Sequence, residues 1–357
     1  MVNQQMGIEE KVLTISVAAY NAEAWLARCL KSLVETDVAA DLDVIVVNDG
    51  STDGTLIVAK EFESNYPDTI RIIDKENGGH GSTINAAIEK ARGKYFKIVD
   101  SDDWVERDGI EHLVDALRNV DCDLVLNPFY TINAVSGEKT LSNDCFETNA
   151  NTTGIPMDIN DVKGKLSFVM HFITYRTSVL QISPYRLDEH CFYVDNEYIV
   201  YYLSSCKSIM LLDCPVYDYL LGTSEQSMNF SNMLRRRSQH EKVCMSCVRF
   251  YAKHPNLSGI RRKAVQSCTL RMVAGTYRIL LCLPYTMSER EIVAFDQAIL
   301  AESPELYRVF LKEYADGSVS KIVRWLRKRN FSHYRMINAF YRIKYRCTNE
   351  TVSTLSE

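Results

Sequence analysis

The sequence lacks the features of a membrane-spanning or exported chain. No window holds about twenty consecutive apolar residues, the length that a helix needs to cross a bilayer. The first twenty residues show no basic segment followed by an apolar run, so no signal peptide is predicted. The 11 cysteines include a single CxxC, Cys244 and Cys247, without a second pair, and we expect reduced, mostly buried thiols. We therefore expect a cytoplasmic protein, with peripheral binding to the inner face of the membrane left open.

The charge balance excludes a general nucleic-acid binder. Lys and Arg number 41 against 46 Asp and Glu, so no broad basic face is expected to replace phosphate counterions. One segment departs from this balance, because no acidic residue stands between Asp316 and Glu350. This basic tail, residues 321–346, interleaves aromatic residues with nine basic ones: Lys321, Arg324, Arg327, Lys328, Arg329, Arg335, Arg342, Lys344 and Arg346.

The tail's apolar residues fall at helical intervals, which predicts two helices, each with one apolar face. Three interpretations stay open. The tail binds an anionic membrane surface, or it packs on the catalytic domain and shows its Lys and Arg to water, or it meets an acidic partner.

Short β-branched runs alternate with helical spacing through the first part of the chain. Strands are expected at 12–19, 43–47, 69–73 and 95–99, and helices at 21–34, 55–62 and 82–91. A further helix (108–117), a strand (123–130), a hairpin or loop insertion (131–153), ordered segments at 168–175 and 209–212 and a helix at 198–203 follow. From about residue 231 the periodicity is helical. The pattern predicts an α/β domain with a mainly parallel sheet over 1–225 and a helical region over 226–357.

Polar residues follow four of the predicted strands. They are Tyr20-Asn21, Asn48-Asp49-Gly50-Ser51, Asn77-Gly78-Gly79-His80-Gly81 and Asp100-Ser101-Asp102-Asp103. Ligands of open α/β sheets gather at the carboxyl ends of the strands, so these four segments are the candidate site. None of them forms GxGxxG or GxxxxGK[ST], which removes the usual support for dinucleotide binding and for a P-loop NTPase.

Three carboxylates stand directly after the fourth strand, at Asp100, Asp102 and Asp103. Carboxylates this close repel one another, and oxygen ligands favour a hard divalent cation, so the cluster predicts Mg²⁺ or Mn²⁺. The alternative is a solvated helix N-terminus, where Asp is favoured by capping and by the helix dipole.

Together, the order and spacing of these segments resemble the family 2 glycosyltransferases of the GT-A fold, over about residues 11–220. The family's P-x-Y-N segment corresponds to Ala18-Ala19-Tyr20-Asn21, without the proline. The resemblance implies nucleotide-sugar contacts in these segments and a DxD metal motif at Asp100-Ser101-Asp102, with Asp103 as an additional acid. The implied nucleotide-sugar residues are Ala18, Tyr20, Asn21, Asp49, Asn77, Gly78, Gly79, Asn85, Asp100 and Ser101.

The resemblance also implies a general base about ninety residues after the DxD motif. Tyr193-Val194-Asp195-Asn196-Glu197 stands there, with Asp195 as the stronger candidate and Glu197 as its alternative. The implied reaction is inverting transfer of a sugar from a UDP-sugar to a hydroxyl of a carbohydrate or lipid-linked acceptor, in cell-surface polysaccharide or glycoconjugate synthesis. A nucleotidyltransferase and a catalytically silent nucleotide-binding or scaffolding protein are the alternatives.

Overall fold

The structure is a computed structural model that describes residues 11–143, 145–146, 152–164, 166–222, 230–312 and 319–345, without the side chains of 286–288. The chain divides into two compact units. The sheet unit comprises residues 1–190 and 205–222, and the helical unit comprises 191–204 and 223–357. The division predicted at residue 225 stays a prediction.

The predicted alternation of strands and helices is confirmed in the sheet unit. The strands are β1 (Leu13–Ala19), β2 (Leu42–Asp49), β3 (Ile70–Lys75) and β4 (Tyr95–Asp100). The helices between them are α1 (Glu23–Val34), α2 (Thr55–Asn65) and α3 (His80–Lys90), with a 3₁₀ turn η1 (Ala39–Asp41) before β2. Nearly all residues of β1, β2 and β4 are buried, which explains their continuous apolar runs.

Within the described residues the large sheet has eight strands in the order β3-β2-β1-β4-β10-β6-β11-β9. It adds β6 (Leu124–Leu126), β9 (Met157–Asp158), β10 (Ile173–Arg176) and β11 (Ser208–Leu211) to the first four strands. The β1, β2, β3 and β4 strands run parallel, and β10 is antiparallel to β4 and β6. The predicted mainly parallel sheet is therefore confirmed.

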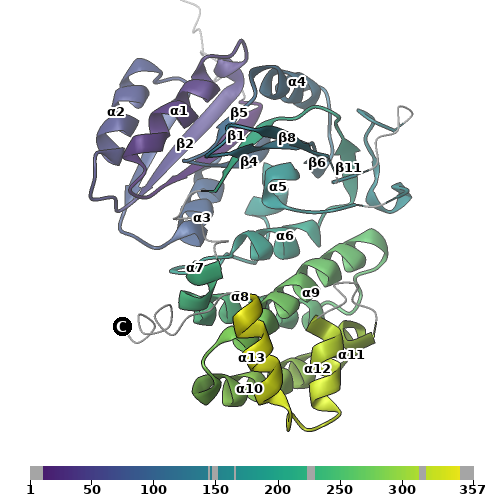
Figure 1. Cartoon of the computed structure of the whole chain (residues 1–357). Coiled ribbons are helices and arrows are strands. Elements are labelled where there is room, and N and C mark those ends of the chain that lie inside the picture. Colours follow the sequence, from purple (N-terminus) through teal and green to yellow (C-terminus); the bar gives the residue numbers. More distant parts are fainter. Residues whose placement is uncertain are drawn as a thin grey trace, which may run out of the picture. The chain divides into compact units, whose positions relative to one another are not determined.

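The strand order creates a switch point between β1 and β4. The first two crossovers run from β1 towards β3, and the third returns to β4 on the other side of β1. Right-handed connections therefore place α1 and α2 on one face and α3 on the other, as Figure 1 shows. In open α/β sheets the crevice at such a switch point receives the ligand.

The predicted strand 123–130 is wrong as one element, because it breaks at Asn127-Pro128 into β6 and β7 (Phe129–Asn133). Pro128 has no N–H to donate to a neighbouring strand. The Asn127 side chain donates a hydrogen bond from Nδ2 to the Pro128 carbonyl at 3.0 Å. The β7 strand instead joins a small sheet of order β5-β12-β7-β8, with β5 (Trp104–Val105), β8 (Lys139–Ser142) and β12 (Tyr217–Leu221). Strands β7 and β8 form an antiparallel hairpin, as predicted within 131–153.

The remaining elements of the sheet unit connect these strands. They are α4 (Arg107–Arg118), η2 (Ile159–Asp161), η3 (Met170–Phe172) and α5 (Thr177–Gln181).

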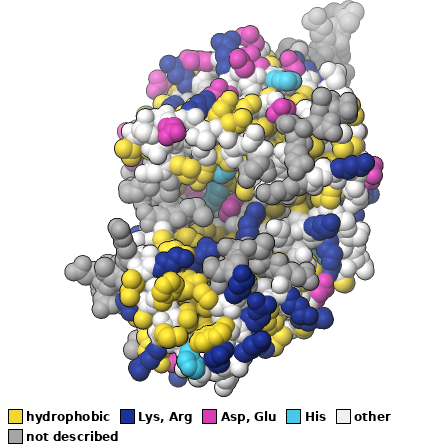
Figure 2. Space-filling view, turned by 45° about the vertical axis from the view of Figure 1, so that its right-hand side comes forward, with side chains coloured by type: hydrophobic (Ala, Val, Ile, Leu, Met, Phe, Trp, Pro, Cys, Tyr) yellow, Lys and Arg dark blue, Asp and Glu magenta, His cyan; other side chains and the backbone are white. Residues whose placement is uncertain are grey.

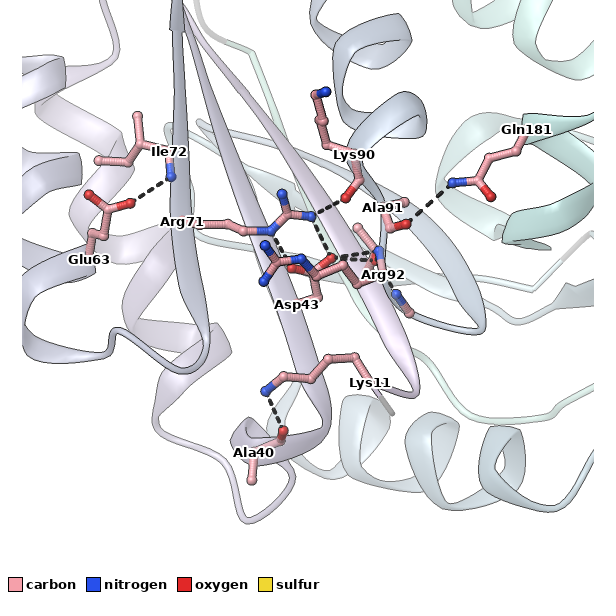
Figure 3. Close-up of polar contacts among 12 residues, drawn as sticks. Lys11, Ala40, Asp43, Glu63, Arg71, Ile72, Lys90, Ala91, Arg92 and Gln181 are labelled. Atoms are coloured by element: carbon pink, nitrogen blue, oxygen red, sulfur yellow. Dashed lines mark hydrogen bonds and ion pairs between the residues drawn. The ribbon is translucent and has the colours of Figure 1, made fainter. Parts of the chain in front are cut away.

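A buried ion pair fixes the amino end of the sheet, away from the candidate site (Figure 3). The Asp43 carboxylate of β2 is 3% exposed and accepts hydrogen bonds from Arg71 Nε at 2.6 Å and Arg71 Nη2 at 2.9 Å. It also accepts from Thr14 Oγ1 at 2.8 Å and from the Arg92 amide at 3.1 Å. Burial alone raises the pKa of Asp43, but the bonds from Arg71 and Thr14 outweigh it and hold the pKa below its ordinary value.

The helical unit contains the helical region predicted for 226–357, together with α6, which was expected within the catalytic domain. They are α6 (Asp195–Leu203), α7 (Phe230–Arg235), α8 (Arg237–Lys253), α9 (Gly259–Cys282), α10 (Tyr285–Glu302), α11 (Pro304–Lys312), α12 (Val319–Arg327) and α13 (Tyr334–Lys344). Helix α9 is central and contacts α6, α8, α10, α12 and α13. Among the described residues, no helix is both long enough and apolar enough to cross a membrane.

Candidate active site

Asp49 organises the glycine-rich loop at the end of β2. Its carboxylate is 2% exposed and accepts hydrogen bonds from the backbone amides of Gly78 at 2.9 Å and Gly79 at 2.7 Å, and from Lys75 Nζ at 2.8 Å. The Asn77 side chain donates to the Asp49 carbonyl at 2.9 Å. Gly79 has a φ of 78°, a conformation that glycine adopts without strain. The predicted residues Asp49, Asn77, Gly78 and Gly79 are therefore brought together into one loop.

The end of β1 is tied to the loop after β2. The Asn21 amide donates to Ser51 Oγ at 3.0 Å, and Asn21 Oδ1 accepts from the Thr52 amide at 2.9 Å. Tyr20, the next residue towards β1, is 55% exposed at this strand end. Ala18 lies inside β1, in register with Asp100 of β4. The ends of β1, β2 and β4 therefore meet at one edge of the sheet.

Asn85 of α3 is bonded to the backbone of Leu187. Its side chain is 4% exposed, donates from Nδ2 to the Leu187 carbonyl at 3.0 Å and accepts from the Leu187 amide at 3.0 Å. This pair of bonds fixes the segment before residue 190 against α3. Asn85 therefore positions the segment that contains Leu187. Its contact with a nucleotide sugar stays a prediction.

The three predicted acids differ in their surroundings after β4. Asp103 is fully buried, and its carboxylate accepts hydrogen bonds from the Tyr217 hydroxyl at 2.5 Å and the Leu220 amide at 2.7 Å. Asp100 lies 3.3 Å from His80 Nε2, and its amide donates to the Tyr217 hydroxyl at 3.1 Å. The loop is held to α1, because the Asp102 carbonyl accepts from Arg28 Nη2 at 2.7 Å. Ser101, between Asp100 and Asp102 in the chain, is buried.

Burial and, after it, mutual repulsion raise the pKa values of two of these acids. Burial, with the nearby Asp100 charge, raises the pKa of Asp102 to about 6. Burial, with the charges of Asp102 and Asp100, raises the pKa of Asp103 well above its ordinary value. Burial by itself raises the pKa of Asp100, but the contact with His80 outweighs it and lowers the pKa overall. Such a cluster favours a cation, because a positive ion relieves the repulsion.

A histidine that the sequence analysis did not select completes the cluster. Ligand atoms of Asp100, Asp103 and His171 lie within 4.8 Å of one another, so the three residues form a candidate metal centre. His171 belongs to η3 and stacks on Tyr219 with ring centroids 4.2 Å apart, while Tyr217 meets it edge-on at 4.7 Å. Burial lowers the pKa of His171 to about 4, which leaves the imidazole neutral and able to bind a metal.

Asp102, predicted to hold the metal together with Asp100 or Asp103, is not part of this group of three. It follows β4 two residues after Asp100, and its metal contact stays a prediction.

A buried lysine supports the turn that carries His171. Lys97 of β4 is fully buried, and its Nζ donates to the carbonyls of His171 at 2.8 Å and Ile173 at 3.3 Å. Burial lowers the pKa of Lys97 to about 7. No sequence pattern identifies this lysine, since a lone charged residue within an apolar strand has no characteristic spacing.

The two candidate bases belong to the helical unit, at the start of α6. Asp195 is half-buried and accepts a hydrogen bond from Asn196 Nδ2 at 3.2 Å. Glu197 is fully buried and accepts from the Tyr201 hydroxyl one turn later at 3.1 Å. Asp195 is therefore the more accessible of the two carboxylates.

Comparison with known proteins agrees with this arrangement of strand ends. Residues 14–181 match the family model described as Glycosyl transferase family 2. The chain carries a family 2 glycosyl transferase domain. This stretch contains β1 to β4, the Asp49 loop, the acids after β4 and His171.

Curated relatives share the transferase domain over limited segments. The glycosyltransferase GlyA of Streptococcus pneumoniae is 35% identical over 132 residues, which cover 37% of this chain and 18% of GlyA. Chondroitin synthase of Escherichia coli is 38% identical over 122 residues, 34% of this chain and 17% of the relative. The teichoic acid poly(glycerol phosphate) polymerase of Staphylococcus epidermidis is 29% identical over 208 residues, 57% of this chain and 28% of the polymerase. The matches thus span less than a third of each of these relatives.

Solved structures confirm the predicted GT-A fold. Residues 1–349 of S. aureus TarS, crystallised with UDP-GlcNAc, superpose with a TM-score of 0.66 at 18% identity. The match covers 93% of this chain and 92% of the TarS chain. The longer S. aureus TarS structure matches with a TM-score of 0.62 at 17% identity, over 92% of this chain and 55% of that chain. At these identities the likeness establishes the fold of the glycosyl transferase domain and its helical C-terminal region.

Proposed function

We propose that the chain transfers a sugar from a UDP-sugar to an acceptor hydroxyl, with inversion at the anomeric carbon and with the help of Mg²⁺ or Mn²⁺. The observation that carries the proposal is the acid cluster after β4, beside the Asp49 loop, at the switch point of a family 2 domain. The TarS structure, which shares this fold and was solved in complex with UDP-GlcNAc, supports a UDP-sugar donor.

The donor set of the candidate centre fits a divalent cation. Asp100 and Asp103 provide carboxylate oxygens and His171 provides a neutral imidazole, and Asp102 is two residues from Asp100. Hard ions of the Mg²⁺ and Mn²⁺ class take such oxygen-rich sites. When bound, the ion supplies a Lewis acid that neutralises charge on the departing diphosphate, an effect of several kcal/mol.

Each remaining residue has a separate task in the proposed reaction. Tyr20 and Asn21 hold the uridine at the end of β1. Asp49 keeps the backbone of Gly78 and Gly79 in place, which allows close approach of the donor to the loop. Asp195 takes the proton of the acceptor hydroxyl as its oxygen attacks, a contribution of roughly a hundred- to ten-thousandfold.

The acceptor is proposed to be a carbohydrate or lipid-linked chain of a cell-surface polysaccharide or glycoconjugate. Support comes from two relatives, a chondroitin synthase and a teichoic acid poly(glycerol phosphate) polymerase. The sugar itself is left to experiment, by a thermal-shift screen of nucleotide sugars with Mn²⁺.

Calorimetry of UDP binding with and without Mn²⁺ tests the metal site. We expect Mn²⁺ to strengthen UDP binding in the natural chain and to have no effect in Asp102→Ala. Asp68→Ala is the matched control, because it removes an exposed acid at the turn before β3. Equal affinity with and without Mn²⁺ in the natural chain would contradict the metal assignment.

A donor and acceptor assay separates the proposed transferase from its alternatives. Release of UDP with sugar transfer supports the proposal, and release of pyrophosphate from a nucleoside triphosphate identifies a nucleotidyltransferase. Tight UDP binding without any turnover across a panel of acceptors identifies a silent binding protein.

A further inference from the structure

Helix α13 carries a row of exposed apolar side chains. Met336, Phe340 and Ile343 are 60%, 58% and 78% exposed. They are spaced four and three residues apart, so they lie along one face of the helix. We call this row the α13 stripe. Apolar side chains gathered on one exposed face indicate an interaction surface, whereas singly exposed ones do not.

Contacts on the other face of α13 fix the outward direction of the stripe. Tyr334, Asn338 and Tyr341 are nearly fully buried. The Tyr334 hydroxyl donates to the Leu280 carbonyl at 3.0 Å, and Asn338 Nδ2 donates to the carbonyls of Leu281 and Leu283, each at 2.9 Å. Because these bonds hold the polar face of α13 on the end of α9, the apolar residues of the stripe point away from the unit.

Basic side chains border the stripe, and the described part of the tail holds no acid. Arg335 and Lys344 are exposed and flank the stripe on either side along α13, while Lys321, Lys328 and Arg329 are exposed on α12 and the turn after it. Figure 2 shows hydrophobic side chains gathered beside Lys and Arg on the helical unit. Arg346, the last basic residue of the predicted tail, lies outside the described residues.

Arg327 of the tail takes part in a buried network inside the unit. Arg327 Nη1 donates to Asp296 Oδ2 at 2.7 Å, and Asp296 is 3% exposed. Asp296 also accepts from the hydroxyls of Tyr277 at 2.9 Å and Tyr307 at 2.5 Å. This network joins α9, α10, α11 and α12, so Arg327 stabilises the helical unit.

We propose that the α13 stripe and its basic border bind an anionic phospholipid surface, with α13 lying in the plane of the headgroups. An apolar row enters the boundary between headgroups and acyl chains, and Lys and Arg at its edges reach lipid phosphates. The positive charge favours an anionic lipid surface over a second copy of the chain. Two copies joined through this face would bring two basic borders together, and these would repel each other. The proposal goes beyond sugar transfer and does not depend on it.

Sedimentation of the full chain with lipid vesicles tests the proposal. One set of vesicles contains phosphatidylcholine with phosphatidylglycerol, and the other contains phosphatidylcholine alone. We expect pelleting with the anionic vesicles at low salt, and weaker pelleting at high salt, because salt screens the basic border. The triple variant Met336→Ser, Phe340→Ser, Ile343→Ser is expected to lose binding by roughly tenfold or more.

Two further variants separate the apolar and the charge contributions. Arg335→Gln with Lys344→Gln is expected to weaken binding severalfold at low salt and to reduce its salt dependence. The control carries Ile57→Ser, Val135→Ser and Ile182→Ser, which are 74%, 90% and 80% exposed in the sheet unit, and is expected to bind like the natural chain. Circular dichroism checks that each variant is folded.

Several results overturn the proposal. Failure of the natural chain to pellet with anionic vesicles at low salt refutes it, as does equal binding to both kinds of vesicle. Unchanged binding of the folded triple variant refutes the assignment to the α13 stripe. A concentration-dependent dimer that the triple variant abolishes, without vesicle binding, identifies a second copy as the occupant.

Discussion

At the scale of single residues, His171 shows how tertiary structure recruits a ligand that sequence spacing does not reveal. It stands about seventy residues after the acids that it joins, in a short 3₁₀ turn before β10. The antiparallel pairing of β10 with β4 places that turn beside the end of β4. Tyr217 and Tyr219 then fix the ring on both sides.

His171→Phe is expected to remove the metal-dependent part of UDP binding. The change keeps an aromatic ring to stack on Tyr219 but removes both ring nitrogens, and loss of a ligand or its support weakens metal binding at least tenfold. Calorimetric titration of UDP with and without Mn²⁺ measures the effect, and His112→Ala, exposed on α4, is the control. Full Mn²⁺ dependence in His171→Phe would show that this histidine is not a ligand.

Asp195→Asn is expected to reduce kcat by about a hundredfold or more while leaving the Kd for UDP nearly unchanged. The substitution keeps the volume of the side chain and removes its capacity as a base. Glu197→Gln serves as the paired variant, because Glu197 is buried and bonded to Tyr201. If Glu197→Gln loses turnover and Asp195→Asn does not, the base must be reassigned to Glu197.

Asp43→Asn is expected to lower the free energy of unfolding by about 3 kcal/mol at neutral pH. Removing the charge leaves the Arg71 guanidinium without an anionic partner at the buried end of β2, and breaking a buried ion pair costs an amount of this order. Urea denaturation followed by circular dichroism measures the loss. Asp68→Asn, at an exposed position, is expected to change stability by less than about 0.5 kcal/mol.

The same carboxylate predicts how stability depends on pH. The pKa of Asp43 is lower in the folded chain than the ordinary value of about 3.9, so the folded state favours the ionised form. Its contribution is therefore complete above the ordinary pKa and is lost as the pH falls towards the folded pKa. The stability difference between the natural chain and Asp43→Asn should shrink on acidification below about pH 4. A difference that grows in acid would contradict the assignment.

At the scale of elements, the sequence predicts best where one period holds over a whole element. The apolar runs of β1, β2 and β4 and the helices between them are found as expected, with boundaries shifted by no more than three residues. The run 123–130 misled, because it is largely apolar and only Asn127-Pro128 marks the change from one sheet to the other. The candidate site follows the same rule: acids and glycines at strand ends can be proposed from the sequence, whereas His171 and Lys97 depend on pairing between distant strands.

Gly81→Ala is expected to destabilise the start of α3 by about 1 to 3 kcal/mol. A Cβ at Gly81 would lie 2.1 Å from the Asp188 carbonyl oxygen, so the segment held by Asn85 must move. Glu89→Ala, exposed at the other end of α3, is the matched control and should be nearly neutral. Thermal unfolding of the three proteins measures the effect, and equal stability would show that the segment adapts without cost.

At the scale of the whole molecule, the average charge and the local charge point to different properties. The net charge of −5 argues against a general nucleic-acid binder, which stays an expectation, yet this average conceals a tail whose charges are all positive. The sequence also predicted that apolar residues would gather on one face of each tail helix. It could not separate the buried face from the exposed one, because Tyr334 and Tyr341 pack while Phe340, of similar size, faces outward.

Binding of UDP and Mn²⁺ is expected to stabilise the sheet unit and to leave the helical unit unchanged. Asp49, the acids after β4 and His171 all belong to the sheet unit, and a ligand that binds only the folded state raises stability by about 2.7 kcal/mol at one hundred times its Kd. Trp25 and Trp104 lie in the sheet unit and Trp325 in the helical unit, so fluorescence of the Trp325→Phe chain reports the sheet unit alone. Its melting temperature should rise with ligand, while a separate circular dichroism transition of the helices stays in place. A single transition that shifts as a whole would show instead that the two units unfold together. If neither signal shifted, the assignment of the nucleotide site to the sheet unit would be wrong.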